Sequence, residues 1–321
     1  LHTEVHSFPT RRSSDLVLMP PPGPVQPGGA DFRRMAFYEG RGATGFSLGQ
    51  PEIVAATGPV SLPMRFEAAL AGARQFVGGR IRDVLDGAAA GIAVALITGE
   101  RGGIPQKAEE ALRVAGLAHV LAISGLHMAL VAGTVFFVVR ALLALVPRLA
   151  LTRPIRKWAA VAALLTAAGY TALSGASVST QRAFVMLAVM LIAVIADRRA
   201  LSMRNVALAA LFVLVVAPDS LLGPSFQMSF AAAMALIAAY ETGSRRRQRR
   251  AGEPPAGPVG RAGRRALRYG GGLFWTSLIA GSATGPIAAF HFHRIAVWGL
   301  LGNLLAMPVV GTMVMPGALI A

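Results

Sequence analysis

The sequence predicts an all-α polytopic membrane bundle of about six to eight transmembrane helices, with a small β fragment at its N-terminal end. Three observations support this fold class. Of the 321 residues, 54% are hydrophobic and only 14% are charged, whereas soluble domains carry about 25% charged residues. The apolar residues gather in long runs. The segments between those runs are alternately rich and poor in arginine.

The apolar runs in the second half of the chain are long enough to be read as membrane helices. The first of them contains no formal charge over 23 residues, which is sufficient to cross a bilayer. The last run reaches the final residue without a basic anchor behind it, so we expect the chain to be truncated there. The predicted spans are residues 117–139, 158–173, 183–196, 206–217, 226–240, 270–290 and 295–321.

The net charge of +16 lies entirely with these apolar runs. Residues 1–110 hold eleven basic and eleven acidic side chains, whereas residues 111–321 hold twenty basic and four acidic ones. Loops at 148–157, 198–204 and 241–268 are basic, and the loops between them are nearly free of arginine. The positive-inside bias therefore predicts that the basic loops are cytoplasmic. A polyanionic cargo would also be attracted to such charge.

The N-terminal part differs in character from the rest. Residues 1–16 are expected to be an extraneous leader, because they have no apolar region typical of a signal peptide. Residues 17–62 are rich in turn-forming residues, with candidate strands at 43–48 and 51–55, and resemble the C-terminal part of a small β domain. Residues 63–83 are predicted to form an amphipathic linker helix, and 84–321 the membrane domain. Within it, residues 84–98 are apolar but short, which favours an interfacial or re-entrant segment.

The most unusual polar side chains are His119, Ser124 and His127, at the start of the first predicted span. In one continuous helix, His119 and His127 would share a face about 12 Å apart, too far for a single metal ion. Polar groups inside a span face protein or water rather than lipid. Three interpretations stay open: hydrogen bonds between helices, the lining of a pore, or a serine–histidine catalytic pair that lacks an orienting carboxylate.

Other candidate residues are more scattered. Arg182 stands on the arginine-poor side, where it is either a snorkelling interfacial residue or a contact for an anionic cargo. Gln227 and Asn303 place amides near prolines that break helices, as is typical of translocation pathways and also of ordinary helix packing. His291 and His293 lack the further ligands that a zinc site needs, so no metal site is expected. The chain has no cysteine, which excludes disulfides and cysteine-ligated metals.

Taken in order, several of these segments resemble the membrane-embedded competence domain of the ComEC family of DNA-uptake proteins. The likeness runs from about residue 85 to the end, and its most specific part is residues 116–127. The other motifs are weaker alone, and their order adds weight. They are Tyr170 with 174–176, Arg182 with Ala183, Pro218 with 225–230, and 302–304 with Pro308.

The resemblance implies an inner-membrane channel that takes up single-stranded DNA during natural transformation, and it identifies residues 17–62 as the end of an OB-like domain. Single-stranded DNA, other components of the uptake machinery and further copies of the chain are the implied partners. Anionic lipid head groups are expected near 245–268, because this loop is rich in arginine. The family's metallo-β-lactamase-like domain is not found in this sequence, so we expect neither enzymatic activity nor a cofactor.

A small-molecule or ion transporter of the cytoplasmic membrane is the alternative. Such a transporter would be expected to carry acidic side chains for coupling inside its spans, and none lies within a predicted span. If the chain is a DNA channel, the candidate lining residues are His119, Ser124, His127, Arg182, Gln227 and Asn303.

Overall fold

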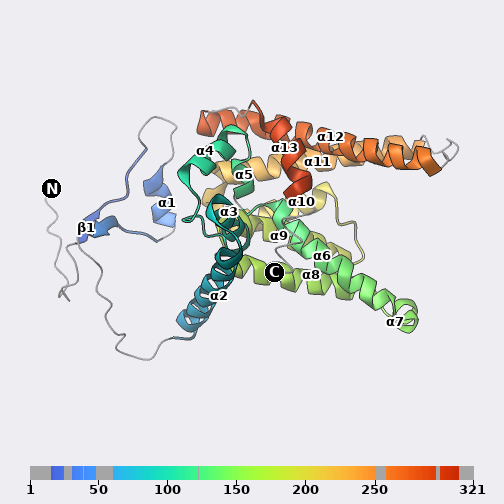
Figure 1. Ribbon diagram of the computed structural model, residues 1–321, viewed down its shortest axis with the longest axis horizontal. Helices are drawn as coiled ribbons and strands as arrows, with labels where there is room; N and C mark the ends of the chain where they lie inside the picture. Colours follow the sequence, from blue (N-terminus) through green and yellow to red (C-terminus); the bar gives the residue numbers. More distant parts are fainter. Residues whose placement is uncertain are drawn as a thin grey trace. The chain divides into compact units, whose positions relative to one another are not determined.

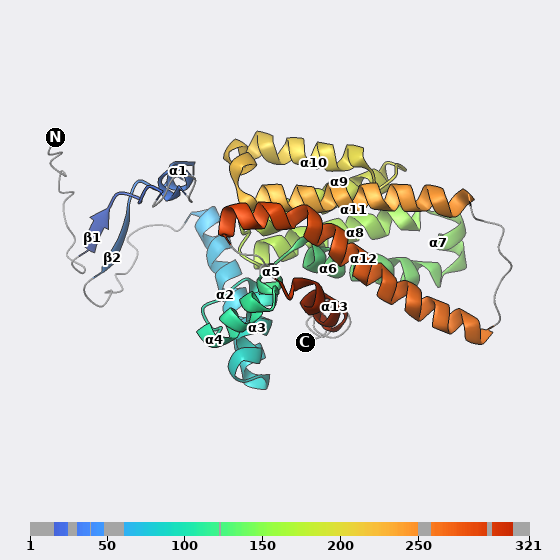
Figure 2. The ribbon, with the colours of Figure 1, turned by 90° about the horizontal axis from the view of Figure 1, so that it is seen from above.

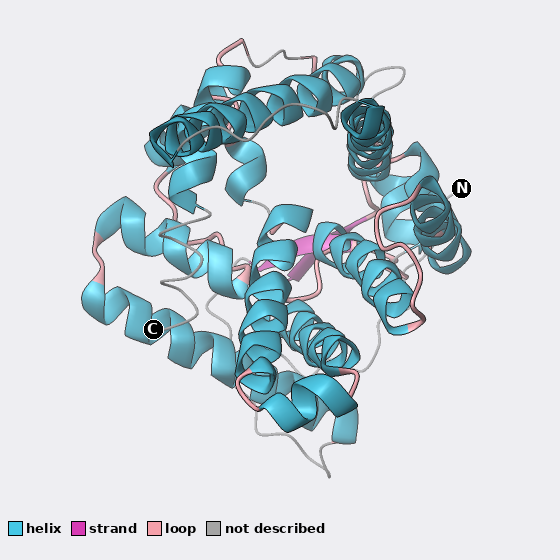
Figure 3. Cartoon of the chain, turned by 90° about the vertical axis from the view of Figure 1, so that its right-hand side faces the viewer, coloured by secondary structure: helices cyan, strands magenta, loops and turns pink. Residues whose placement is uncertain are grey.

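The computed structural model is helical almost throughout, and its only regular exception among the described residues is one pair of strands (Figures 1 and 3). It divides into two compact units, Leu1–Arg65 and Phe66–Ala321. The structure describes residues 16–24, 31–38, 40–47, 61–121, 123–249, 258–293 and 297–310.

The first unit contains a two-stranded antiparallel sheet. Strand β1 (Leu16–Met19) pairs with β2 (Thr44–Ser47), and the short helix α1 (Phe32–Tyr38) lies between them in the chain. Strand β2 falls within the strand predicted at 43–48, whereas α1 was not predicted. The strand predicted at 51–55 and nearly all of the expected leader lie outside the described residues.

Four helices lead into the membrane bundle. The stretch predicted as an amphipathic helix forms α2 (Leu62–Val84), and the short apolar stretch after it forms α3 (Gly87–Thr98). Helix α4 (Gln106–Val114) carries a charged face, and α5 (Ala118–Leu121) is a single turn.

The remaining helices form the bundle itself. Helix α11 begins at a proline, directly after a 3-10 turn, so proline sets where this helix can start. Their bounds are α6 Gly125–Ala144, α7 Pro147–Thr152, α8 Ile155–Leu173, α9 Val178–Ile195, α10 Met203–Val216, the 3-10 turn η1 Pro218–Leu222, α11 Pro224–Arg249, α12 Pro258–Phe292 and α13 Gly299–Val309.

Within the described residues, three helical segments are long and apolar enough to cross a membrane: Gly125–Ala144, Val178–Ile195 and Gly270–Phe292. Two shorter apolar helices, Gly87–Thr98 and Met203–Val216, accompany them. Large apolar side chains cover the outer surface of this unit, which is expected where lipid rather than water is the solvent. The protein is therefore a helical membrane protein. The six to eight spans that the sequence predicts are not confirmed, because three segments of the described part meet the length and hydropathy of a span.

Small side chains let α6 and α8 approach closely. Four alanines in a helical repeat, all of them completely buried, form most of the buried face of α8. Membrane helices associate through such faces, because small residues allow backbones to come into contact. Helix α6 packs along this face, and α9 packs against both helices. The alanines are Ala159, Ala160, Ala163 and Ala167.

Side-chain and helix contacts show the relative directions of the helices. Lys157 at the start of α8 pairs with Asp197 after the end of α9, with 2.5 Å between nitrogen and oxygen, so these helices are antiparallel. Helices α6 and α8, joined by α7, are antiparallel as well, and α11 and α12 run side by side (Figure 2). The bundle thus has an arginine-rich end, where α6 and α9 end and α8 begins. At the opposite, arginine-poor end, α8 ends and α6, α9 and α11 begin.

Candidate functional site

The first predicted span is not one continuous helix. Residues 118–121 form the short helix α5, and the long helix α6 begins only at Gly125. Ser124 has extended backbone angles (φ −109°, ψ 173°) and occupies the N-cap position of α6. Serine favours this position because its side chain can bond to free backbone groups at the start of a helix. The prediction of a single helix over 117–139 was therefore wrong.

Ser124 and His127 together cap the N-terminus of α6. The backbone N–H of Ser124 donates to Nδ1 of His127 at 3.1 Å, and the serine hydroxyl lies 3.1 Å from the same nitrogen. The imidazole thus takes the part that a glutamate or glutamine plays in a capping box. Since Nδ1 accepts the backbone hydrogen bond, the neutral ring carries its proton on Nε2. That Nε2 is buried and has no hydrogen-bond partner among the described residues.

The two histidines lie in different environments. His127 is 1% exposed and sits among the apolar side chains around α6 and α8, whereas His119 is exposed on α5. Nδ1 of His119 lies 3.0 Å from the carbonyl oxygen of Gly116, three residues earlier in the chain, so this contact is local. Because α5 and α6 are separate helices, the expected shared helical face of His119 and His127 does not exist. The break at Ser124 is the reason for this correction.

Arg182 is buried inside the bundle. Its side chain is 4% exposed, and no other charged residue occurs in α9. One terminal nitrogen, Nη1, donates to the carbonyl of Val178 at 3.3 Å, and Nη2 donates to the hydroxyl of Ser229 at 3.4 Å. Both distances exceed the usual range for N–H···O bonds. The Nε atom is buried without a partner among the described residues.

Gln227 on α11 contacts His291 on α12, a contact that the sequence did not indicate. Its Nε2 donates to the carbonyl of Leu221 at 3.1 Å, so its Oε1 faces Nε2 of His291 at 2.9 Å. The imidazole N–H is therefore the donor in this contact. His291 was considered in the sequence only as a metal ligand. No group of three or more potential metal ligands occurs among the described residues.

Asn303 lies on α13, where this helix approaches the segment before α5. A Cβ atom on the preceding residue, Gly302, would come within 2.5 Å of the carbonyl oxygen of Ala115, so only glycine allows this approach. The Oδ1 atom of Asn303 is buried and has no partner among the described residues. Like Nε2 of His127 and Nε of Arg182, it is a buried polar atom that could bind a further group.

Four of the six candidate residues, Ser124, His127, Arg182 and Gln227, lie at the arginine-poor end. Arg182 and Ser229 connect the beginnings of α9 and α11, and Gln227 and His291 connect the beginning of α11 to the end of α12. Ser124 and His127 lie at the beginning of α6, which is at the same end of the bundle. In the described part of the chain, no hydrogen bond joins the Ser124–His127 pair to the contacts made by Arg182 and Gln227.

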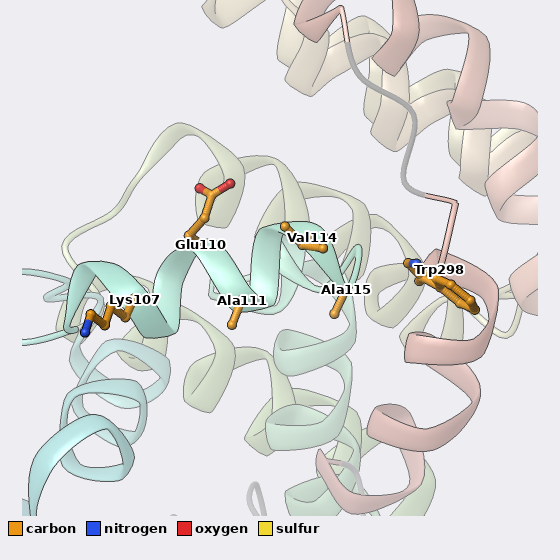
Figure 4. A pocket seen from close by; sticks show the side chains of 6 residues that line it. All are labelled: Lys107, Glu110, Ala111, Val114, Ala115 and Trp298. Carbon is orange, nitrogen blue, oxygen red and sulfur yellow. The ribbon is translucent and has the colours of Figure 1, made fainter.

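An open pocket of about 620 Å³ lies beside α4, close to the start of α13 (Figure 4). Val114, Ala111 and Ala115 form its apolar floor, and the exposed indole of Trp298 forms one wall. Lys107 and Glu110 place one charge of each sign at its edge. This pocket contains none of the candidate residues.

Comparisons with known proteins agree with the motifs. The chain is 28% identical over 228 residues to "ComE operon protein 3" of Bacillus subtilis (strain 168), covering 71% of this chain and 26% of that protein. It is 41% identical over 98 residues to "Competence protein ComA" of Neisseria gonorrhoeae, covering 30% of this chain and 14% of that protein. The chain thus spans 26% and 14% of the lengths of these relatives, and no solved structure matches it significantly. The sequence model of the Competence protein family matches residues 96–321, so the chain belongs to this family.

Proposed function

We propose that this chain forms part of an inner-membrane channel through which single-stranded DNA enters the cytoplasm during natural transformation. Membership of the competence family over residues 96–321 is the observation that carries this proposal. One of its relatives is named as a competence protein, and helices of span length support a place in the membrane. The polar side chains assigned to the path are His119, Ser124, His127, Arg182, Gln227 and Asn303.

The gathering of polar groups at one end of an otherwise apolar bundle supports this assignment. Polar and ionisable residues inside a membrane are costly, and they mark substrate or ion pathways when they are retained. Two of them, the Arg182 guanidinium and Nε2–H of His127, are buried donors without a full set of partners in the described residues, which suits an anionic strand. A transporter that couples to ions is the alternative, but the three span-length segments contain no acidic residue. We propose no catalytic step for this chain.

The surroundings of the channel follow from charge. We propose that the protein crosses the inner membrane several times, with its basic loops in the cytoplasm and the arginine-poor end outside. The basic segment 245–268 would lie against anionic lipid head groups. Further copies of the chain and other components of the uptake machinery would complete the path.

The proposed function is tested by DNA uptake in cells from which the gene has been deleted. We expect these cells to bind DNA at their surface but to accumulate none in the cytoplasm, and transformants to be lost. Reintroducing the intact gene should restore both. Uptake of a labelled small solute serves as the control. Normal transformation in the deletion strain, or loss of solute uptake instead of DNA uptake, would favour the alternative function as a transporter.

Topology gives a separate prediction. Cysteines introduced at Ser177 and Ser244 would be the only thiols, because the chain contains no cysteine. An impermeant thiol reagent applied to intact spheroplasts should label residue 177, between α8 and α9, and not residue 244 near the end of α11. Permeabilised cells, in which both sites should react, provide the control. The opposite labelling pattern would invert the proposed orientation.

A further inference from the structure

Arg182 differs from Arg74 and Arg140 in its burial and in the hydrogen bonds that its guanidinium makes. Arg74 on α2 is also partly buried, but it donates to the carbonyls of Leu173 and Ala172 at 2.7 and 2.9 Å and thereby caps the end of α8. Arg140 on α6 is exposed. Arg182 is buried, its two hydrogen bonds are long, and its Nε has no partner.

No carboxylate offsets this charge in the described part of the chain. The ion pairs found there join Arg113 to Glu109 and Glu110, and Lys157 to Asp197. None of them involves Arg182. Burying a cation without a counter-ion is strongly unfavourable, so such groups are normally paired or satisfied by several good hydrogen bonds. The structure therefore leaves a place for an anion at Arg182.

The geometry favours a phosphodiester as that anion. A guanidinium presents its donors in a planar fork, which matches two oxygens of a phosphate and binds them more tightly than neutral donors would. Ser229, two residues from Gln227 on α11, adds a hydroxyl that accepts from Arg182 and can donate its own hydrogen to the same group. Phosphate contacts carry no sequence information, so one such site would serve every nucleotide in turn.

We propose that Arg182, assisted by Ser229, binds one backbone phosphate of the strand that passes through the bundle. The proposal rests on the proposed function, because that function supplies the polyanion. The beginnings of α9 and α11 would then form the wall of the path that contacts phosphate. A phosphodiester can also come from an anionic lipid head group, and the experiment distinguishes these two sources.

The test measures thermal unfolding of the intact protein in phosphatidylcholine nanodiscs, with and without oligothymidylate. Wild-type protein should be stabilised by the oligonucleotide, because a ligand that binds only the folded state raises Tm. Arg182→Gln should weaken the apparent affinity by about ten- to a hundredfold, the usual loss for a charge-assisted hydrogen bond. Arg182→Lys should retain part of it, and Ser229→Ala should weaken it less than Arg182→Gln.

The unliganded proteins separate a binding role from a structural one. If Arg182 is a binding residue without its anion, Arg182→Gln removes an uncompensated buried charge. The Tm of the unliganded variant should then equal or exceed that of the unliganded wild type. A purely structural arginine predicts a lower Tm with the response to oligothymidylate intact, and that result would overturn the proposal. Arg140→Gln, which removes an exposed arginine from the neighbouring helix, should change neither quantity.

Two further probes identify the source of the phosphate. A methylphosphonate oligonucleotide, whose backbone is uncharged, should give no shift in Tm. Nanodiscs containing phosphatidylglycerol should not reproduce the effect of the oligonucleotide. Stabilisation by this lipid, abolished by Arg182→Gln, together with no response to oligothymidylate would reassign the site to a lipid. If cells take up DNA normally with Arg182→Gln, this inference fails while the proposed function stands. If the deletion strain takes up DNA normally, the proposed function fails.

Discussion

Replacing His127 with leucine is expected to lower both the amount of protein in the membrane and the DNA uptake of each inserted molecule. The first effect follows from the hydrogen bond that Nδ1 accepts from the N–H of Ser124. Without this acceptor, a backbone donor is left unpaired at the start of α6, which costs about 1–3 kcal/mol. The second effect follows from the buried Nε2–H, which we assign to the path. Immunoblotting of membranes, combined with uptake of labelled DNA, measures both.

Glutamine at this position provides the matched control. Its side chain can reach back to the N-cap N–H, as in an ordinary capping box, so His127→Gln should restore the amount of inserted protein. It should not restore uptake per molecule, because the imidazole Nε2–H is still missing. Full recovery of both quantities would show that His127 only caps the helix, and it would remove this residue from the path.

Replacing Gly99 with alanine is expected to reduce the folded protein severely. This residue ends α3 in the left-handed region (φ +80°), and its N–H donates to the carbonyl of Ala95. The left-handed conformation costs a residue with a Cβ about 1–2 kcal/mol. In addition, that Cβ would lie 2.4 Å from the carbonyl oxygen of Ser174, so α3 and the end of α8 would have to separate. Overpacking of this kind costs a further 1–3 kcal/mol or so.

The loss should appear as a lower Tm in detergent and as a several-fold drop in the protein recovered from membranes. Gly133→Ala in α6 is the control, because a Cβ there would meet no atom within 4 Å. That substitution should leave stability unchanged or raise it by about 0.5–1 kcal/mol, since alanine favours the helix. Equal behaviour of the two variants would contradict the close contact between α3 and α8.

Local patterns were enough to predict the helical membrane fold and most of the helices. Strong hydropathy located the segments that become α8, α9 and α10, and charge contrast distinguished the two ends of the bundle. The break at Ser124 was missed because residues 117–139 are mostly apolar and carry no formal charge, and hydropathy carries no information about backbone angles. A serine followed by glycine, three residues before a side chain able to accept a hydrogen bond, was the available sign of a helix start.

Contacts between segments distant in the chain could not be predicted from the sequence. The bond between His291 and Gln227 joins residues 64 positions apart, and no local pattern links them. The same holds for Arg182 and Ser229, 47 positions apart. The sequence marked Arg182 and Gln227 as candidates because charges and amides are rare in such surroundings. It could not indicate that one of them lacks a counter-ion while the other has found a partner.

The row of alanines on α8 has a mechanical consequence. Because the four alanines that α8 contributes to its contact with α6 have no rotatable bonds beyond Cβ, α8 cannot adapt on this face by changing rotamers. The seam from α9 through α11 to α12 is different, since its polar contacts are made by arginine, glutamine and histidine side chains that can swing. Widening of the bundle to admit a strand would therefore occur along this seam, while α6 and α8 hold their spacing.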